Sequence, residues 1–190
     1  MLFRSATVDE PGTTGEVLAN RLATIFEAHG GTRIEQATDP EKIEKLFLAR
    51  RMAYPALERL GQVLTEDICV PRSAVSEMLS RIEASAAKFD VVIANIAHAG
   101  DGNLHPQIIV PQGENEAKER AKLAFDEIVA DCRLLGGTVT GEHGVGLLKL
   151  DGAAAELELR VIDMHQSVKK ALDPNGTLNP GKAFPHTYRN

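Results

Sequence analysis

The feature that most constrains the fold is a pair of apolar segments separated by a short, turn-forming stretch. Residues 91–97 are a nearly continuous apolar run with β-branched side chains, which is typical of a buried strand. Residues 104–110 predict a second strand, which Pro111 ends. The residues between the two runs include glycine, aspartate and asparagine, which tolerate tight-turn geometry. We therefore expect these two segments to form an antiparallel hairpin.

Amphipathic helices are expected around this hairpin, because apolar side chains recur at helical spacing along much of the remaining chain. Thr13 and Glu16 form a capping box, and Asp39 is a capping residue before a first-turn proline, Pro40. The expected helices cover residues 13–29, 40–54, 71–89, 115–135 and 153–172, and short strands are expected at residues 2–8 and 32–38. These elements predict an α+β fold in one domain over residues 1–190, with an antiparallel sheet and helices packed mainly on one face.

The charge and cysteine content exclude some functions. The chain carries 27 acidic and 21 basic side chains, a net charge of −6, so it has no general attraction for nucleic acid. Its apolar runs are shorter than the ~20 residues that a transmembrane helix needs, and no transmembrane segment is expected. Cys69 and Cys132 lie far apart in sequence and form neither a CxxC pair nor a dense disulfide pattern. Two reduced thiols predict a cytoplasmic protein.

Two histidines flank the hairpin turn. His98 ends the first strand and His105 begins the second, so the two side chains are expected to lie opposite each other. Opposed positions on paired strands lie about 5 Å apart. At that separation, two imidazoles can bind one metal ion at about 2.0–2.1 Å each. The alternative is a hairpin with two ordinary polar side chains.

A second glycine-rich stretch, residues 141–146, places Glu142 beside His143. Glu142 could supply a third metal ligand, and two histidines with one carboxylate leave coordination positions open, as catalytic sites require. His143 would then be free to act as a general base, because an imidazole titrates near neutral pH. The alternative is a glycine-rich loop that packs against a neighbouring element.

One arginine occupies an unusual position in the helix expected after Pro40. Arg50 falls in the middle of the face that Ile43, Leu46 and Phe47 define. An arginine on an apolar face needs an anion, and its planar guanidinium suits a carboxylate. The alternatives are an ion pair with an acidic side chain of the protein, or a long side chain that extends to water.

Three stretches of the chain resemble one known family. They are HAGDGNLHP at residues 98–106, GGTVTGEHGVGLLK at residues 136–149 and LDPNGTLNPGK at residues 172–182. They resemble the FAD-linked oxidase C-terminal domain, the cap half of glycolate oxidase FAD-linked subunits, D-lactate dehydrogenases and D-2-hydroxyglutarate dehydrogenases. The resemblance implies a ferredoxin-like cap domain. It also implies oxidation of a D-2-hydroxyacid to a 2-oxoacid, with hydride transfer to FAD.

The resemblance also implies roles for individual residues. His98, His105 and Glu142 match the ligands of a divalent metal, usually zinc. His143 matches the general base that takes the hydroxyl proton, and Arg50 matches the arginine that binds the substrate carboxylate.

Three residues are expected to border the cofactor. Asn179 corresponds to a residue near the flavin edge, and Asn103 and Glu142 are also expected on the cofactor side of the site.

Some positions differ from the 2-hydroxyglutarate-type members of the family. Thr65 replaces the lysine that binds the distal carboxylate, two residues before Asp67. Tyr54 stands at the position of a substrate-binding threonine, and Gln107 replaces an asparagine two residues after His105. A monocarboxylate such as glycolate or lactate is therefore favoured as substrate.

The family's FAD-binding domain, with its glycine-rich pyrophosphate loop, is not expected in this chain. The chain is expected to begin at the first strand of the cap domain and to be inactive alone. An FAD-binding domain or subunit is the expected partner, and a homodimer is left open. The alternative functions are a non-catalytic subunit of a flavoprotein complex and a metal-dependent hydrolase.

Overall fold

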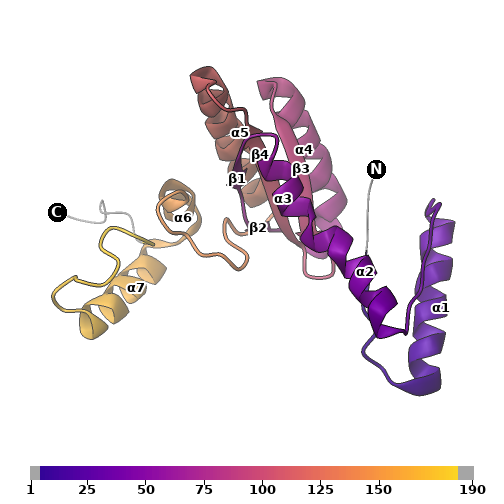
Figure 1. Cartoon of the computed structure of the whole chain (residues 1–190). Helices are drawn as coiled ribbons and strands as arrows, with labels where there is room; N and C mark the ends of the chain where they lie inside the picture. Colours follow the sequence, from indigo (N-terminus) through magenta and orange to yellow (C-terminus); the bar gives the residue numbers. More distant parts are fainter. Residues whose placement is uncertain (1–4, 184–190) are drawn as a thin grey trace. The chain divides into compact units, whose positions relative to one another are not determined.

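The computed structural model describes residues 5–183, apart from the side chain of Ala49. The chain forms two compact units, residues 1–53 and residues 54–190, and each is described by itself (Figure 1). The prediction of one domain over residues 1–190 stays a prediction.

The first unit contains two helices, α1 (Gly12–Ala28) and α2 (Pro40–Arg51). The prediction of a capping box at Thr13 and Glu16 was wrong, because α1 already begins at Gly12 and Thr13 therefore lies inside the helix. The start of α2 is confirmed, since the Asp39 carboxylate accepts a hydrogen bond from the backbone N–H of Lys42 at 3.0 Å.

The two strands predicted in this unit were wrong within the described chain. Residues 5–8 and 32–38 have no regular structure, and residues 2–4 lie outside the described residues. Their short apolar patterns do not suffice to form strands, because a strand also needs a neighbouring strand to satisfy the hydrogen-bonding capacity of its backbone groups.

The second unit follows from Tyr54, within α3 (Ala53–Glu58), which carries Pro55 in its first turn. A four-stranded antiparallel sheet follows, formed by β1 (Gln62–Thr65), β2 (Ile68–Cys69), β3 (Val92–His98) and β4 (Asn103–Val110). The strand β4 pairs with β3 on one side and with β1 and β2 on the other. The predicted hairpin is confirmed, whereas the sequence did not predict β1 and β2.

The strands β1 and β2 are two parts of one interrupted strand. Val63 pairs with Ile109, and Ile68 pairs with Leu104. The register is the same on both sides of the gap, so Glu66 and Asp67 stand opposite Pro106 and His105. The backbone N–H of Glu66 donates to the Pro106 carbonyl at 2.9 Å, which holds the gap in this register.

The order of elements explains the ferredoxin-like character of this unit. The interrupted strand is followed by the short η1 (Arg72–Ala74) and α4 (Val75–Phe89), then by β3, β4 and α5 (Asn115–Leu134). This order matches the ferredoxin-like β-α-β-β-α-β fold from its first strand to its second helix. In place of the last strand, Thr138 forms a single antiparallel bridge with Cys69. The α+β prediction is confirmed.

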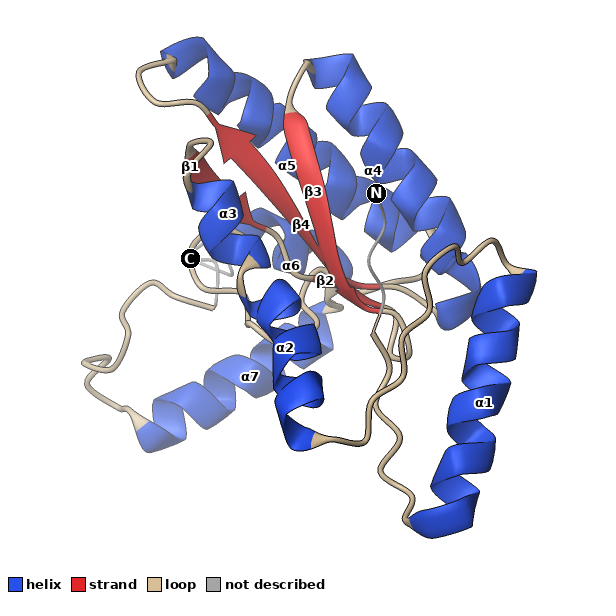
Figure 2. Ribbon diagram, turned by 45° about the vertical axis from the view of Figure 1, so that its right-hand side comes forward, coloured by secondary structure: helices blue, strands red, loops and turns tan. Residues whose placement is uncertain are grey.

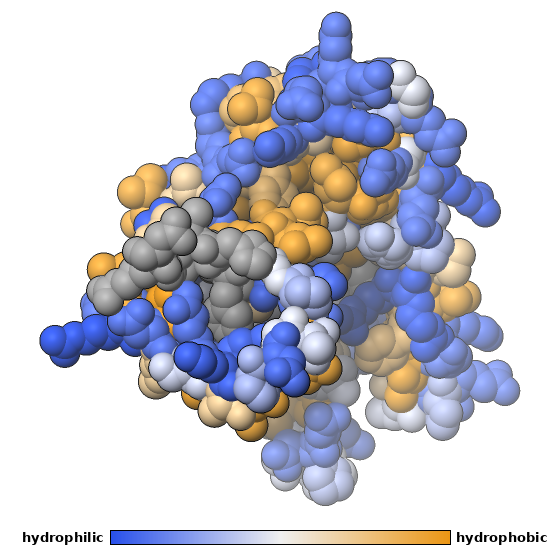
Figure 3. All heavy atoms as spheres, turned by 90° about the vertical axis from the view of Figure 1, so that its left-hand side faces the viewer, coloured by the Kyte–Doolittle hydropathy of each residue, from blue (hydrophilic) through white to orange (hydrophobic). Residues whose placement is uncertain are grey.

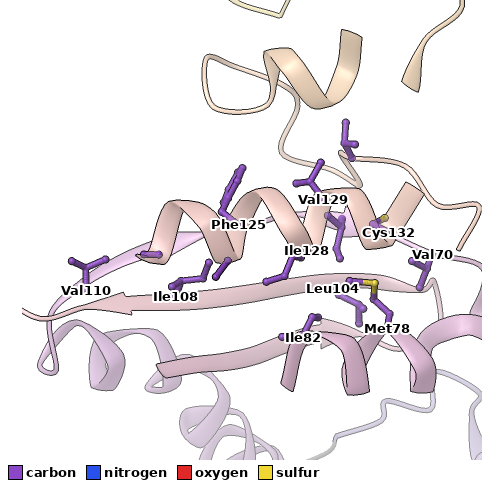
Figure 4. Close-up of a cluster of buried hydrophobic side chains, with 14 of the residues drawn as sticks. Val70, Met78, Ile82, Leu104, Ile108, Val110, Phe125, Ile128, Val129 and Cys132 are labelled. Carbon is purple, nitrogen blue, oxygen red and sulfur yellow. The ribbon is translucent and has the colours of Figure 1, made fainter. Parts of the chain in front are cut away.

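Helices α4 and α5 pack against one face of the sheet and form the core with it (Figures 2 and 4). The core residues include Ile68, Leu104 and Ile108 from the sheet, and Met78, Ile82, Ala121, Ala124 and Ile128 from the helices. The strand β4 is buried along its whole length, although burial was predicted for residues 91–97 and so for β3. The strand β3 is not, because it lies at the edge of the sheet, and Val92 is 63% exposed.

The end of the described chain departs from the prediction. The single helix expected at residues 153–172 is two helices, α6 (Leu150–Glu156) and α7 (Leu159–Leu172). Leu157 and Glu158 separate them with extended backbone. Several large apolar side chains of this region remain exposed: Leu147, Leu148, Leu159, Met164, Val168, Leu172 and Leu178. Figure 3 shows hydrophobic residues at the surface of one face of the molecule.

Candidate metal centre

The hairpin places its two histidines on the same face of the sheet, but not opposite each other. His98 pairs with Asn103, and His105 pairs with Ile96. The prediction of an opposed pair was therefore wrong, because the turn joins His98 to Asn103 and His105 lies two residues further along β4. Positions two apart on a strand point to the same face. The two imidazole rings meet edge to face, with their centroids 5.4 Å apart.

The loop after the Cys69–Thr138 bridge brings a carboxylate to these rings. The Oε1 atom of Glu142 lies 3.1 Å from Nε2 of His105 and 3.5 Å from Nε2 of His98. The same oxygen lies 3.8 Å from Nε2 of His143. The structure thus brings together three of the residues that the sequence singled out as metal ligands and the one singled out as a base.

The environment of His105 fits a metal-binding imidazole. Its side chain is 7% exposed, and its Nδ1 has no hydrogen-bond partner among the described residues. That atom lies 3.5 Å from Oδ1 of Asp67. A carboxylate near one ring nitrogen favours the proton there and leaves the other nitrogen free to bind a cation. In this geometry the free nitrogen is Nε2, which faces Glu142 and His98.

Burial lowers the pKa of His105, and the neighbouring His143 lowers it further. Asp67 and Glu142 oppose this shift without reversing it. The folded protein therefore favours the neutral imidazole, which is the form that binds metal. The donor set of two imidazoles and one carboxylate suits zinc and similar divalent ions.

A pH dependence of stability follows from this shift. Above a pH of about 6.5, the ordinary pKa of histidine, His105 is neutral in both the folded and the unfolded chain. Below it the unfolded chain binds a proton that the folded protein resists, so the free energy of unfolding falls with the pH. Urea unfolding in the presence of a chelator measures the free energy of unfolding at pH about 7.5 and at pH about 5.5. The decrease from the higher to the lower pH should be smaller for His105→Gln than for wild type. Equal losses in the two proteins would contradict the assignment.

Asp67 is a central residue of this site that the sequence reasoning missed. Its side chain is 1% exposed, and its Oδ2 accepts the backbone N–H groups of Gly141, Glu142 and His143 at 2.9, 3.0 and 2.8 Å. Burial alone would raise the pKa of Asp67, but the N–H groups of His143 and Glu142 and the charge of Lys149 hold it below its ordinary value. The available signal was an acidic pair, Glu66 and Asp67, between two apolar segments, because buried acids require donors.

A buried ion pair lies beside Asp67, and the sequence did not point to it either. The Lys149 ammonium lies 2.7 Å from Oε1 of Glu66, and their side chains are 6% and 0% exposed. Lys149 also donates to the backbone carbonyl of Asp67. Burial raises the pKa of Glu66 even though Lys149 opposes the shift.

Among residues 5–183, two overlapping sets of side chains could hold a cation. One is His98, His105 and Glu142, and the other is Asp67, His105 and His143; in each set the ligand atoms lie within 4.8 Å of one another. The carboxylate of Asp67 already accepts several hydrogen bonds, whereas that of Glu142 faces imidazole nitrogens. The first set therefore fits a cation better, and it leaves His143, 49% exposed, free for another role.

Asn103 lies at the edge of the site. It is buried at the start of β4, and its Oδ1 has no hydrogen-bond partner in the described part of the chain. Gly141 packs directly over its amide, because a Cβ at residue 141 would lie 2.4 Å from Asn103 Oδ1. The glycine thus lets the loop approach the hairpin.

The remaining predicted site residues lie apart from this cluster in the sequence. Asn179 is exposed in the turn after α7, with a left-handed φ of 46°. Arg50 is exposed in the last turn of α2 and belongs to the first unit, so its relation to the cluster is not defined.

Two further sequence predictions concern the described residues as a whole. Cys69 and Cys132 are both free, as expected, and burial raises the pKa of the Cys132 thiol to about 12. Within residues 5–183, every helix is too short or too polar to cross a bilayer.

Known proteins resemble the chain over nearly its whole length. The glycolate oxidase subunit GlcD of Bacillus subtilis (strain 168) is 39% identical over 177 residues, which are 93% of this chain and 38% of that protein. The glycolate oxidase subunit GlcD of Escherichia coli (strain K12) is 34% identical over 170 residues, 89% of this chain and 34% of that protein. A mitochondrial D-lactate dehydrogenase (cytochrome) of Arabidopsis thaliana is 33% identical over 164 residues, 85% of this chain and 29% of that protein.

The chain thus spans about a third of the length of these curated relatives. Residues 2–183 match the family described as FAD linked oxidases, C-terminal domain. The resemblance that the three sequence stretches carried is confirmed. This chain therefore belongs to the family of C-terminal domains of FAD linked oxidases.

Proposed function

We propose that this chain is the substrate- and metal-binding part of an FAD-dependent 2-hydroxyacid dehydrogenase. The observation that carries the proposal is the convergence of His98, His105 and Glu142, with His143 beside them, in a member of this family. Such an enzyme would oxidise a D-2-hydroxyacid to a 2-oxoacid.

Each side chain of the site would have its own role in this reaction. His98, His105 and Glu142 would hold a divalent metal, with zinc favoured by the nitrogen and oxygen donors. A bound metal would lower the pKa of the substrate hydroxyl and fix its direction. The half-exposed His143 would take the proton from that hydroxyl as C2 loses hydride. FAD would accept the hydride.

Other residues would position the substrate and the cofactor. Arg50 would bind the substrate carboxylate with its planar guanidinium. Asn179, Asn103 and Glu142 would border the flavin. The unpartnered Oδ1 of Asn103 supports a polar contact for its side chain.

A monocarboxylate such as glycolate or D-lactate is the favoured substrate. Thr65 pairs with Gln107 in the sheet register, and its hydroxyl donates to Oε1 of Gln107 at 2.7 Å. Gln107 lies two residues from His105, so this neutral pair faces the same side of the sheet. A second substrate carboxylate would find there two neutral side chains that already bind each other. The names of the similar glycolate oxidase subunits and D-lactate dehydrogenase agree with this choice.

An FAD-binding domain or subunit is the proposed partner. The exposed apolar side chains near the end of the described chain, such as Leu148 and Leu172, offer a surface for it. A homodimer stays a prediction, and so does the cytoplasmic location, with which the two free thiols agree.

The proposed reaction can be tested in a chimera in which this chain replaces the matching part of the Bacillus subtilis glycolate oxidase subunit. Glycolate or D-lactate, added without oxygen, is expected to bleach the flavin absorbance, because hydride reduces the flavin. Removing metal with a chelator, or replacing His105 by alanine, should abolish both zinc binding and bleaching. A flavin-loaded chimera that neither substrate reduces, beside an active parent subunit, would refute the proposed function.

A further inference from the structure

The loop that carries Glu142 and His143 has no regular secondary structure of its own. Residues 139–149 form bends and turns between the Thr138 bridge and α6. A side chain on such a loop needs contacts from elsewhere to hold its position. The side-chain groups that bind Thr140, Gly141, Glu142, His143 and Lys149 come from Glu66 and Asp67, in the two-residue gap between β1 and β2.

One carboxylate in this gap binds the loop through four donors. The backbone N–H groups of Gly141, Glu142 and His143 and the hydroxyl of Thr140 all donate to Oδ2 of Asp67. Three consecutive N–H groups that point at one anion form a backbone nest. Here the anion is a side chain of the protein, and the nest fixes the direction in which Glu142 leaves the loop.

The same carboxylate reaches the other ligand-bearing element. The register places Asp67 opposite His105, and Oδ1 of Asp67 lies 3.5 Å from Nδ1 of the imidazole. Asp67 therefore contacts the sheet side and the loop side of the candidate metal centre at once. Glu66, next to it, binds Lys149 and so holds the far end of the loop.

We propose that Asp67 is the positioning residue of the metal centre: it sets the position of Glu142 relative to His105 and orients the His105 ring. The inference rests on the proposed function, since it concerns the same ligands, but it also makes a claim about the metal-free loop. Asp67 is not itself a ligand in this arrangement, because four donors occupy its Oδ2 and its Oδ1 faces Nδ1 of His105.

The substitution Asp67→Asn tests the proposal at nearly constant shape. The amide oxygen can take the place of Oδ2 in the nest, but it carries no full negative charge and so binds the four donors more weakly. The NH₂ group then replaces Oδ1, and it cannot attract a proton on Nδ1 of His105. Changes to the groups that orient metal ligands cost about 10- to 100-fold in metal affinity. We expect zinc affinity, measured by competition with a chelator, to fall within that range. The visible spectrum of the Co²⁺-loaded protein should also change, because the ligand geometry changes.

Hydrogen exchange of the metal-free protein supplies an independent readout. The amides of residues 141–143 should exchange faster in Asp67→Asn than in wild type. Asp173→Asn is the matched control, because the buried Asp173 carboxylate also accepts backbone N–H groups, from Thr177 and Leu178. Asp173→Asn should leave both zinc affinity and exchange at residues 141–143 unchanged.

The outcomes separate this proposal from the proposed function. A folded Asp67→Asn variant with wild-type zinc affinity and exchange overturns the positioning role and leaves the metal centre intact. If wild type binds no zinc, the metal centre fails, and exchange at residues 141–143 still decides whether Asp67 holds the loop. If Asp67→Asn does not fold, Thr140→Val, which removes one donor to Asp67, should show the same changes at smaller size, and their absence overturns the proposal.

Discussion

Replacing Lys149 by methionine is expected to destabilise the protein by about 3–5 kcal/mol, the cost of breaking a buried ion pair from one side. The variant leaves the fully buried Glu66 without its cation, and the carboxylate cannot reach water. It also removes the donor to the Asp67 carbonyl. Urea unfolding at neutral pH measures the loss. The loss should shrink in acid, because burial favours the protonated form of Glu66.

Two further variants control this prediction. Lys88→Met breaks the ion pair with Glu127, whose side chains are 60% and 29% exposed, and should cost less than about 1 kcal/mol. The double variant Glu66→Gln with Lys149→Met removes both charges and should recover part of the loss. A Lys149→Met protein as stable as Lys88→Met would show that the buried pair contributes little.

The second large effect is expected on the chemical step. His143→Asn in the chimera with the Bacillus subtilis subunit should slow flavin reduction by about 10²- to 10⁴-fold, the contribution of a positioned general base. Zinc affinity should stay close to that of wild type, because His143 lies outside the favoured ligand set of His98, His105 and Glu142. Stopped-flow absorbance of the flavin measures the rate.

The metal measurement decides how a slow His143→Asn variant is interpreted. If zinc affinity falls together with the rate, His143 belongs to the ligand set with Asp67 and His105 instead. If neither quantity changes, His143 is not the base. Flavin reduction at several pH values adds a check, because the loss of the base should remove the acid limb of the wild-type profile.

The sequence predicted those parts of the fold that local patterns determine. The hairpin, α4 and α5 follow from apolar periodicity, and each is confirmed. The strand formed by β1 and β2 escaped prediction because Glu66 and Asp67 interrupt its apolar pattern. The break between α6 and α7 escaped it too, because no glycine or proline stands at Leu157 and Glu158.

In the candidate site too, the sequence predicted the residues that a local pattern reveals and missed one that depends on tertiary contacts. His98, His105, Glu142 and His143 were singled out because their residue types and glycine-rich surroundings are visible in a short window of sequence. Asp67 was not, because the loop residues that donate to it lie more than 70 residues away along the chain. The donors that justify a buried acid come from tertiary contacts, which a local pattern does not reveal.

In the second unit, a single bridge at Thr138 stands in place of a last strand, and this affects where the sequence of the domain can vary. After the single bridge between Thr138 and Cys69, the chain leaves the sheet and becomes the loop that carries Glu142. Most of the core lies between α4, α5 and the sheet, and the segment after the bridge adds Val139 and, from α6, Ala153. Substitutions at the exposed residues 146–148, between His143 and the buried Lys149, could therefore change the surface beside the site without disturbing the hydrophobic core. The fold thus separates the part that must be stable from the part that can diversify.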